Sequence, residues 1–338
     1  MKTKNVLALL FCLLMFSVNI ANANNITVSN FALTSRNVAS HYIMVKFDIS
    51  WENSWRTSSA PNNWDAAWIF VKYRIGTSEW QHAWLNNVGH INPAGSTINT
   101  GLLASAPFNE TTNPGMGVFI YRDADGVGTF SKTGVQLRWN YGANGVADND
   151  VIDIRLYAIE MVYVPQGSFF IGSGGTEAML GGFFKYPTTT NPYQVTIESG
   201  QITVGTSNNN LYYTYYGDRS SIPAAFPKGF NPFYCMKYEI SQQGYVDFLN
   251  NLTQTQADER KYTYSGYRYA ITGSTVGSYS TGNPNVACNY LSWGDLAAYL
   301  DWSGLRPMSE LEFEKSCRGT LSPVPDEYAW GSTVCAQL

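Results

Sequence analysis

Apolar and polar residues alternate along the first part of the chain. Every second residue from Ile43 to Trp51 is apolar. The same two-residue period recurs in three further segments: 69–73, 135–139 and 152–156. Alternation places one set of side chains in a core and the other toward solvent, which is the pattern of half-buried β-strands. Turn-forming runs rich in Asn, Pro, Gly and Asp separate these segments, so we predict an antiparallel β-sandwich over residues 24–159.

The second part of the chain, residues 160–338, contains three positions where a helix is expected to begin. Ser241 precedes apolar residues at helical spacing. Ser292 and Ser309 are each followed three residues later by an acidic residue, which is the pattern of a capping box. A glycine ends the pattern after each of these two segments. We therefore predict three short helices within otherwise irregular, Gly- and Tyr-rich sequence.

The composition is typical of a folded extracellular protein. The 338 residues are enough for two domains, and 44% of them are hydrophobic, which excludes wholesale disorder. Charged residues make up only 14%, against about 25% in an average soluble domain. Uncharged polar side chains must therefore cover much of the surface. The net charge of −4 provides no basic excess to neutralise phosphates, which argues against nucleic-acid binding.

Residues 1–23 have the pattern of a secretory signal peptide. Two lysines near the start precede an apolar run from Val6 to Val18, and Ala21-Asn22-Ala23 has the small residues of a cleavage site. No later segment approaches the roughly 20 apolar residues that a transmembrane helix needs. We therefore expect a protein that is secreted, periplasmic or held at the cell surface, without a transmembrane span.

Export permits disulfides between the cysteines that follow the signal peptide. These are Cys235, Cys288, Cys317 and Cys335. Four cysteines allow three complete pairings, and the sequence does not choose among them. The chain has no C-x-x-C spacing, which disfavours a structural zinc site. Small buried residues, or one or two structural bridges, are the expected roles.

Five ordered segments of the second part contain motifs that occur together in one protein family. They are Met161–Ser173, Phe233–Asn250, Asn285–Trp293, Leu305–Gly319 and Tyr328–Gly331. The fourth contains Leu-Arg-Pro-Met-Ser-Glu-Leu-Glu-Phe-Glu. Together they resemble the formylglycine-generating-enzyme, or sulfatase-modifying-factor, family. The resemblance covers residues 160–338 and implies an α+β fold akin to C-type lectins, with little regular secondary structure. It does not extend to residues 24–159.

The same resemblance implies copper and calcium as cofactors of the family, but it assigns none of their ligands to this chain. Family members continue well beyond the Tyr328–Gly331 motif, into closing strands with calcium-binding loops and, in catalysts, a copper-binding cysteine pair. This chain ends at Leu338, so we expect a family domain truncated at its C-terminus. Cys335 falls too early to match either active cysteine. We therefore expect no catalytic residue, metal ligand or cofactor in this chain.

Other residues with suitable chemistry are assigned structural roles. His82 and His90 flank Trp84, but isolated histidines are more often satisfied polar residues than metal ligands. Asp123 and Asp125 resemble the start of a calcium loop that lacks its closing Glu, which favours a hairpin turn. Three acidic residues are expected to stabilise the start of the last helix: Glu310, Glu312 and Glu314.

Two groups of tyrosines form the candidate binding surface. They are Tyr212, Tyr213, Tyr215, Tyr216, Tyr262, Tyr264, Tyr267 and Tyr269. Tyrosine offers a broad apolar face and a hydroxyl at low entropic cost, which suits recognition of a peptide or a sugar. The competing role is the packing of loops in a fold with little regular structure.

Three functional hypotheses follow from the sequence. The first is an exported, non-catalytic binding or scaffold protein whose partner is a protein or glycan at the cell surface. The second is a copper-dependent formylglycine-generating oxidase of protein cysteines, whose active-site part is missing from this chain. The third is a carbohydrate-binding module formed by the sandwich and its exposed aromatic residues.

Overall fold

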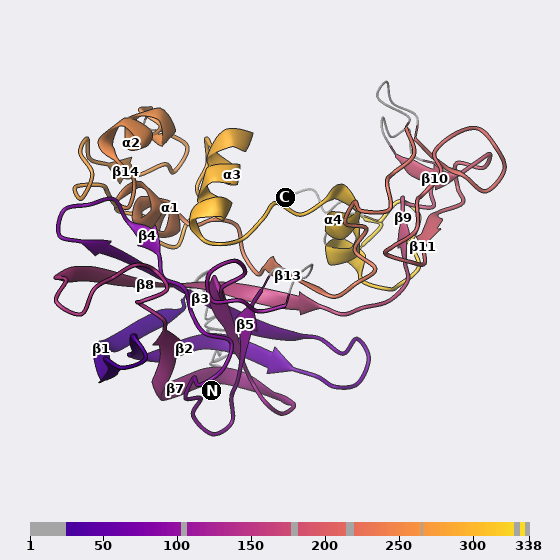
Figure 1. Ribbon diagram of the computed structural model, residues 1–338. Helices are drawn as coiled ribbons and strands as arrows, with labels where there is room; N and C mark the ends of the chain where they lie inside the picture. Colours follow the sequence, from indigo (N-terminus) through magenta and orange to yellow (C-terminus); the bar gives the residue numbers. More distant parts are fainter. Residues whose placement is uncertain are drawn as a thin grey trace, which may run out of the picture.

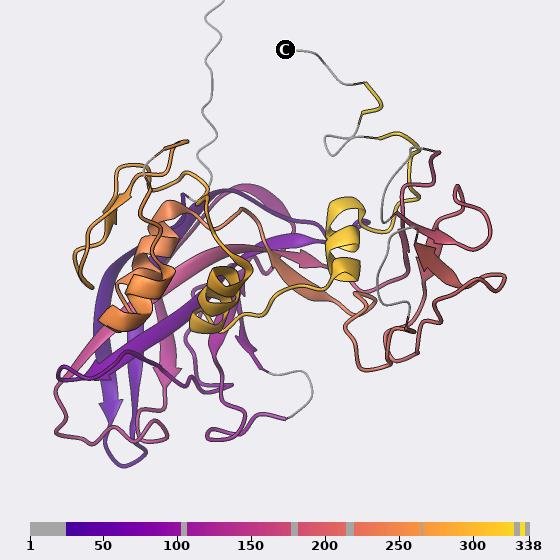
Figure 2. The ribbon, with the colours of Figure 1, turned by 90° about the horizontal axis from the view of Figure 1, so that it is seen from above.

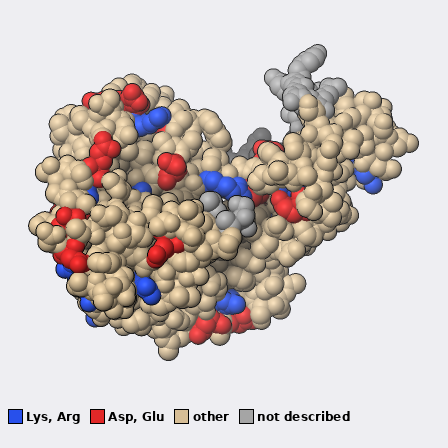
Figure 3. Space-filling view, viewed as in Figure 1, with Lys and Arg blue, Asp and Glu red and all other residues tan. Residues whose placement is uncertain are grey.

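The computed structural model describes residues 25–102, 107–176, 182–213, 220–264, 266–327 and 332–334. The predicted signal peptide lies outside these residues. The described chain is mainly β, with strands in several sheets and a few short helices (Figures 1 and 2). No helix among the described residues is long and apolar enough to cross a membrane. Charged side chains are sparse on the face seen in Figure 3, as the composition predicts.

One layer of the N-terminal part is a three-stranded antiparallel sheet. It consists of β1 (Thr27–Asn37), β2 (Tyr42–Arg56) and β7 (Gly126–Trp139), with β2 in the middle. The alternating segment from Ile43 to Trp51 falls within β2. Its apolar residues lie in the main hydrophobic core, which confirms the strand predicted from the pattern.

The second layer is also antiparallel and is centred on β3 (Trp64–Ile75). Its other strands are β4 (Gln81–His82), β5 (Thr97–Gly101), β6 (Gly117–Tyr121), β8 (Ile152–Val164) and β13 (Phe233–Met236). The two layers join at the β2–β3 corner, where Arg56 pairs with Trp64. Alternate residues of β2, β3 and β7 fill one core between the layers. The predicted antiparallel sandwich is therefore confirmed.

The connection at Asp123–Gly126 is not the hairpin turn that the sequence predicted. β6 pairs with β3 and β5, whereas β7 pairs with β2. The connection therefore takes the chain from one layer to the other. Asp125 accepts a hydrogen bond from Ser58 Oγ at 2.8 Å, which holds this turn against the β2–β3 connection.

Strand β8 is shared by the two parts of the chain. It pairs with β3 over the whole length of that strand, from Trp64 opposite Tyr163 to Ile75 opposite Ile152. Its last residues also pair with β13, which comes about seventy residues later in the sequence. The expected change of domain, between residues 159 and 160, falls inside this strand. A strand of the second part thus extends a sheet of the first.

The outer face of this layer is covered by helices of the second part (Figure 2). Trp68 and Phe70 of β3 point away from the sandwich core and pack against α1 (Gln242–Leu249) and α3 (Trp293–Trp302). Trp68 Nε1 also donates a hydrogen bond to the backbone oxygen of Ser303 at 2.8 Å. Because its side chains are buried on both faces, β3 holds the two parts together.

All three predicted helices are present and begin where the sequence predicts. Ser241 caps α1, Ser292 caps α3 and Ser309 caps α4 (Glu310–Arg318). In α3 and α4 the capping box is complete, because the N-cap side chain and the acidic side chain three residues later each accept a backbone hydrogen bond.

A fourth helix, α2 (Gln254–Arg260), was not predicted. Thr253 and Gln256 form a capping box at its start. Ala257 is its one buried residue, so the sequence of this helix has no apolar stripe from which it could be predicted.

The rest of the second part contains short two-stranded sheets joined by irregular segments. They pair β9 (Phe169–Ile171) with β11 (Tyr193–Val195), β10 (Phe183–Lys185) with β12 (Leu211–Tyr213), and β14 (Ile271–Thr272) with β15 (Ser280–Thr281). Strand β9 packs against Leu311 of α4 in a small separate core. This sparse secondary structure is consistent with the C-type-lectin-like fold that the family resemblance implies.

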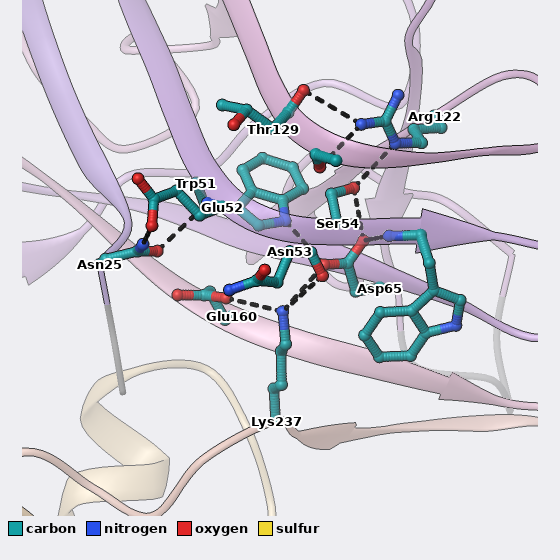
Figure 4. A network of polar contacts seen from close by, with 12 residues as sticks. Asn25, Trp51, Glu52, Asn53, Ser54, Asp65, Arg122, Thr129, Glu160 and Lys237 are labelled. Atoms are coloured by element: carbon teal, nitrogen blue, oxygen red, sulfur yellow. Dashed lines mark hydrogen bonds and ion pairs between the residues drawn. The ribbon is translucent and has the colours of Figure 1, made fainter. Parts of the chain in front are cut away.

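A buried lysine connects β13 to the sandwich (Figure 4). Lys237 follows β13 directly, and its Nζ lies 3.1 Å from Asp65 Oδ2 on β3 and 3.1 Å from Glu160 Oε2 on β8. The exposed fractions of these side chains are 9% for Lys237, 0% for Asp65 and 1% for Glu160. One ammonium is therefore within ion-pair distance of two carboxylates on neighbouring strands.

Asp65 is also held by the N-terminal sheet. Its carboxylate accepts hydrogen bonds from Trp51 Nε1 and Ser54 Oγ, both at 2.8 Å, and from the backbone amide of Trp55 at 3.1 Å. These donors stabilise its charged form away from water. Asp65 is consequently a fixed anchor for the lysine of the second part.

Burial and charge act in opposite directions on the other two groups. Burial raises the pKa of Glu160, although the lysine beside it opposes this shift. For Lys237, burial disfavours the ammonium, but the attraction of Asp65 and Glu160 outweighs it and raises the pKa. The lysine therefore stays charged at neutral pH and offsets the cost of burying the acids.

Replacing this lysine should destabilise the whole fold. In Lys237→Met two buried carboxylates lose their cation, which typically costs about 3–5 kcal/mol for a buried pair. We expect a clear fall in Tm measured by calorimetry. The matched control is Lys261→Met, which breaks the exposed pair with Asp258 and should leave Tm nearly unchanged. Wild-type stability of Lys237→Met would contradict the anchoring role.

Candidate functional site

Four tyrosines gather beside α2, from segments that are separate in the sequence. The rings of Tyr262 and Tyr290 are stacked, with centroids 4.2 Å apart and planes inclined by 12°. Tyr264 meets both edge-on at 6.3–6.4 Å, and Tyr269 meets both edge-on at 5.9–6.0 Å. Such edge-to-face arrangements are favourable aromatic contacts. Tyr290 was not among the predicted residues, although it lies in the Asn285–Trp293 motif.

These rings differ in what they offer to a ligand. Tyr262 is 40% exposed and Tyr264 56%, and neighbouring Tyr267 is 82% exposed. Tyr269, which was predicted as a surface residue, is only 6% exposed. Burial raises the pKa of Tyr269 to about 12. Tyr269 therefore packs beneath the rings of Tyr262 and Tyr290 and is not available to a ligand. We call the other four residues, Tyr262, Tyr264, Tyr267 and Tyr290, the tyrosine surface.

The backbone beneath the tyrosine surface is strained. Tyr267, Arg268 and Tyr290 have φ values of 46°, 69° and 61°, in the left-handed region that side chains other than glycine rarely adopt. Gln242 Nε2, on a fully buried residue of α1, donates to the backbone oxygen of Arg268 at 2.8 Å. Asn289 Nδ2 donates to the backbone oxygen of Tyr267 at 3.0 Å. Backbone strain of this kind is concentrated at functional sites.

The other predicted tyrosines lie elsewhere. Tyr212 and Tyr213 belong to β12, where they are half-buried. Tyr212 packs against Phe184, and Tyr213 against Phe183 on the paired strand. Tyr215 and Tyr216 fall outside the described residues. Figures 1 and 2 place β10, the partner of β12, at the opposite end of the molecule from α2, so the two groups do not form one surface.

Three cysteines are described, and none forms a disulfide with another described residue. Burial, reinforced by nearby Asp295, raises the pKa of Cys288 to about 12. Burial also raises the pKa of Cys235 and of Cys317, the exposed member of the set. Burial thus disfavours the thiolate, which is the reactive form of cysteine, at each of these three positions. Cys335, and any pairing with it, lies outside the described residues.

The histidines considered as metal ligands have protein partners. His82 bonds to the backbone oxygen of Met116 through Nε2. His90 accepts a hydrogen bond from the backbone amide of Arg138 at 3.1 Å, and its Nε2 lies 2.8 Å from the backbone oxygen of Asn86. Burial lowers the pKa of His82 to about 3 and that of His90 to about 4. The described residues include no cluster of three or more His, Cys, Asp or Glu side chains that would hold a metal ion.

The acidic residues of α4 differ in their contacts. Glu312 accepts the backbone hydrogen bond of Ser309 at 2.8 Å and is paired with Arg306 at 2.6 Å, which is the expected capping role. Glu310 lies in the first turn. Glu314 lies 3.7 Å from Arg318 on the same helix, and burial raises its pKa.

Comparison with known proteins finds similarity within the second part of the chain. Residues 180–337 match the family model described as "Sulfatase-modifying factor enzyme 1-like domain". A segment of 51 residues is 43% identical to a formylglycine-generating enzyme of Streptomyces coelicolor. That segment covers 15% of this chain and 16% of the relative, so it spans only a small part of either protein. No solved structure matches the chain.

The raised thiol pKa values predict how the cysteines react. We expect iodoacetamide to label exposed Cys317 first at pH 8, and Cys288 much more slowly, because the thiolate is the reacting form. The measurement is a labelling time course read by peptide mass spectrometry, with the unfolded chain as the control in which all sites react. If Cys288 were labelled as fast as Cys317 in the native protein, the assigned environment of Cys288 would be wrong.

Proposed function

We propose that the protein is an exported binding protein without catalytic activity. Its residues 180–337 match the model of the sulfatase-modifying factor enzyme 1-like domain. In this proposal the tyrosine surface binds a peptide segment of a protein partner. The signal-like N-terminus supports export, and the sparse surface charge fits an extracellular setting.

The observation on which the proposal rests is the construction of the tyrosine surface. Three of its rings are exposed, and one of these, Tyr267, lies on strained backbone next to Arg268, whose backbone oxygen buried Gln242 holds in place. A surface already fixed before binding loses less entropy when it captures a ligand, which raises affinity. Tyrosine is moreover enriched among the residues that dominate binding energy at protein interfaces.

The geometry of the rings favours a peptide over a sugar. Sugar rings pack flat on free aromatic faces, but Tyr262 and Tyr290 each direct one face against the other. Their edges and hydroxyl groups remain, together with the exposed ring of Tyr267, and these suit the amides and side chains of a peptide. For this reason we place the protein partner ahead of the glycan.

The second candidate function is formylglycine generation, which the name of the matched relative supports. Copper-dependent oxidation of this kind requires thiolates that converge on a soft metal ion. We rank this candidate second because the family resemblance assigns no active cysteine to a residue of this chain.

The proposal is tested with peptides selected on the full chain from a random library. Tyr264→Ala and Tyr267→Ala should each raise the Kd of the selected peptides about tenfold. An aromatic residue at an interface typically contributes about 1–2 kcal/mol to the binding free energy. The matched control is Phe31→Ala, an exposed aromatic residue of β1, which should leave Kd unchanged. Titration calorimetry provides the measurement.

Three outcomes would contradict this assignment. If the selected peptides bound both tyrosine variants as tightly as the wild type, the tyrosine surface would not be their binding site. If the wild type bound to a glycan array and both variants did not, the ligand of the tyrosine surface would be a glycan and not a peptide. Conversion of a cysteine peptide to formylglycine by the copper-loaded chain would establish the second candidate.

A further inference from the structure

A cavity of about 380 Å³ lies where α1 meets the outer sheet, away from the tyrosine surface. Its lining comes from both parts of the chain: Arg155, Leu156 and Tyr157 of β8, Asp247 of α1, and Asn250 and Gly277. Asn250 fixes the far rim, because its Oδ1 accepts hydrogen bonds from the backbone amides of Gly277 and Tyr279 at 2.8 and 3.2 Å. The site exists only because the two parts are packed together.

The guanidinium of Arg155 is held in position without being neutralised. It lies over the ring of Trp80, 4.3 Å from the centroid, and its Nη1 donates to the backbone oxygen of Asn250 at 3.1 Å. Among the described residues, no carboxylate oxygen lies within 4.0 Å of it. A fixed arginine with N–H groups to spare is suited to receive a carboxylate.

Asp247 presents the opposite charge to the same cavity. Its Oδ1 accepts a hydrogen bond from Gln243 Nε2 at 2.9 Å, one turn earlier in α1. The carboxylate forms no ion pair with any described residue, although Arg155 lines the same cavity. Burial raises the pKa of Asp247 to about 6, and Gln243 and Arg155 only partly oppose this shift. Arg155 and Asp247 are thus each held by other residues, Arg155 by Asn250 and Trp80 and Asp247 by Gln243, and do not form an ion pair with each other.

We propose that this cavity binds a small zwitterion of the α-amino-acid class, with its carboxylate on Arg155 and its ammonium on Asp247. Such a ligand pairs both charges at once, whereas a ligand with one charge leaves the other side chain, which is half-buried, without a partner of opposite charge. The volume is sufficient for one amino acid, and Leu156 and Tyr157 supply apolar contact for its side chain. The inference does not depend on the peptide-binding role proposed above.

The probe is L-leucine, titrated into the full chain by calorimetry. Two analogues each carry one of its charges: L-leucinamide is only a cation and 4-methylpentanoate is only an anion at neutral pH. We expect L-leucine to bind at least tenfold more tightly than either analogue. Asp247→Asn and Arg155→Gln should each weaken the binding of L-leucine about tenfold, since each variant loses a charge-assisted hydrogen bond to the ligand. The control, Asp258→Asn on the surface of α2, should change nothing.

The pH dependence provides a second readout. The other charged or titratable groups around Asp247 are Arg155 and Tyr157 of β8 and Tyr299 of α3, and burial raises the pKa of both tyrosines. Asp247 is therefore the group among them that titrates between pH 5 and 8. Below a pKa of about 6 its carboxyl is neutral, so binding of L-leucine should weaken roughly tenfold from pH 8 to pH 5 in the wild type but not in Asp247→Asn.

Several results would overturn the proposal. No heat with any probe at millimolar concentration would mean that the cavity holds only water. If 4-methylpentanoate bound as tightly as L-leucine, the ammonium group would contribute nothing, and the cavity would be a site for anions. Undiminished L-leucine binding in both variants would place the ligand elsewhere on the molecule. Measuring Tm for each variant separates these results from loss of folding.

Discussion

The ammonium of Lys237, placed between two buried carboxylates, is the contact on which the arrangement of this protein depends. It belongs to the second part of the chain, whereas Asp65 and Glu160 lie on adjacent strands of the sandwich layer. Burying two acids side by side is unfavourable unless a cation accompanies them. The sheet is therefore complete only when β13 brings its lysine alongside β8. Helices α1 and α3 then cover the outer face of β3.

Both candidate sites follow from this shared sheet. The cavity has one wall on β8 and another on α1, so the distance between Arg155 and Asp247 is set by how the helix packs on the sheet. The tyrosine surface depends on the same helix, because buried Gln242 of α1 supports the strained loop beneath the rings. A change at the junction would therefore disturb both sites together.

Local pattern was sufficient to predict the four longest described strands and three helices, but not how they assemble. The alternation in β2 and the caps at Ser292 and Ser309 identified strands and helices, because each depends on residues close together in sequence. The pairing of β8 with β13 joins residues far apart in the chain, and nothing in either segment specifies its partner. Helix α2 escaped prediction because it is almost entirely polar.

The sites show the same limit. A tyrosine cluster was predictable from composition, but burial of Tyr269 and the inclusion of Tyr290 depend on the path of the loops. Arg155 and Asp247 each resemble ordinary surface charges in the sequence. Only the packing of α1 on β8 brings them to one cavity. Outside these sites, Asp65 could have been recognised in the sequence as a buried acid, because it begins the largely apolar segment of β3 and so requires a buried partner.

The central claim is that the two parts fold around one sheet as a single unit, and native-state hydrogen exchange tests it most directly. The amides of β3, β8 and β13 should exchange with the same free energy of opening, and that energy should fall equally in all three strands as denaturant is added. Exchange of β13 and α1 at a distinctly lower free energy than β3 would mean that the second part opens independently, and would contradict the account.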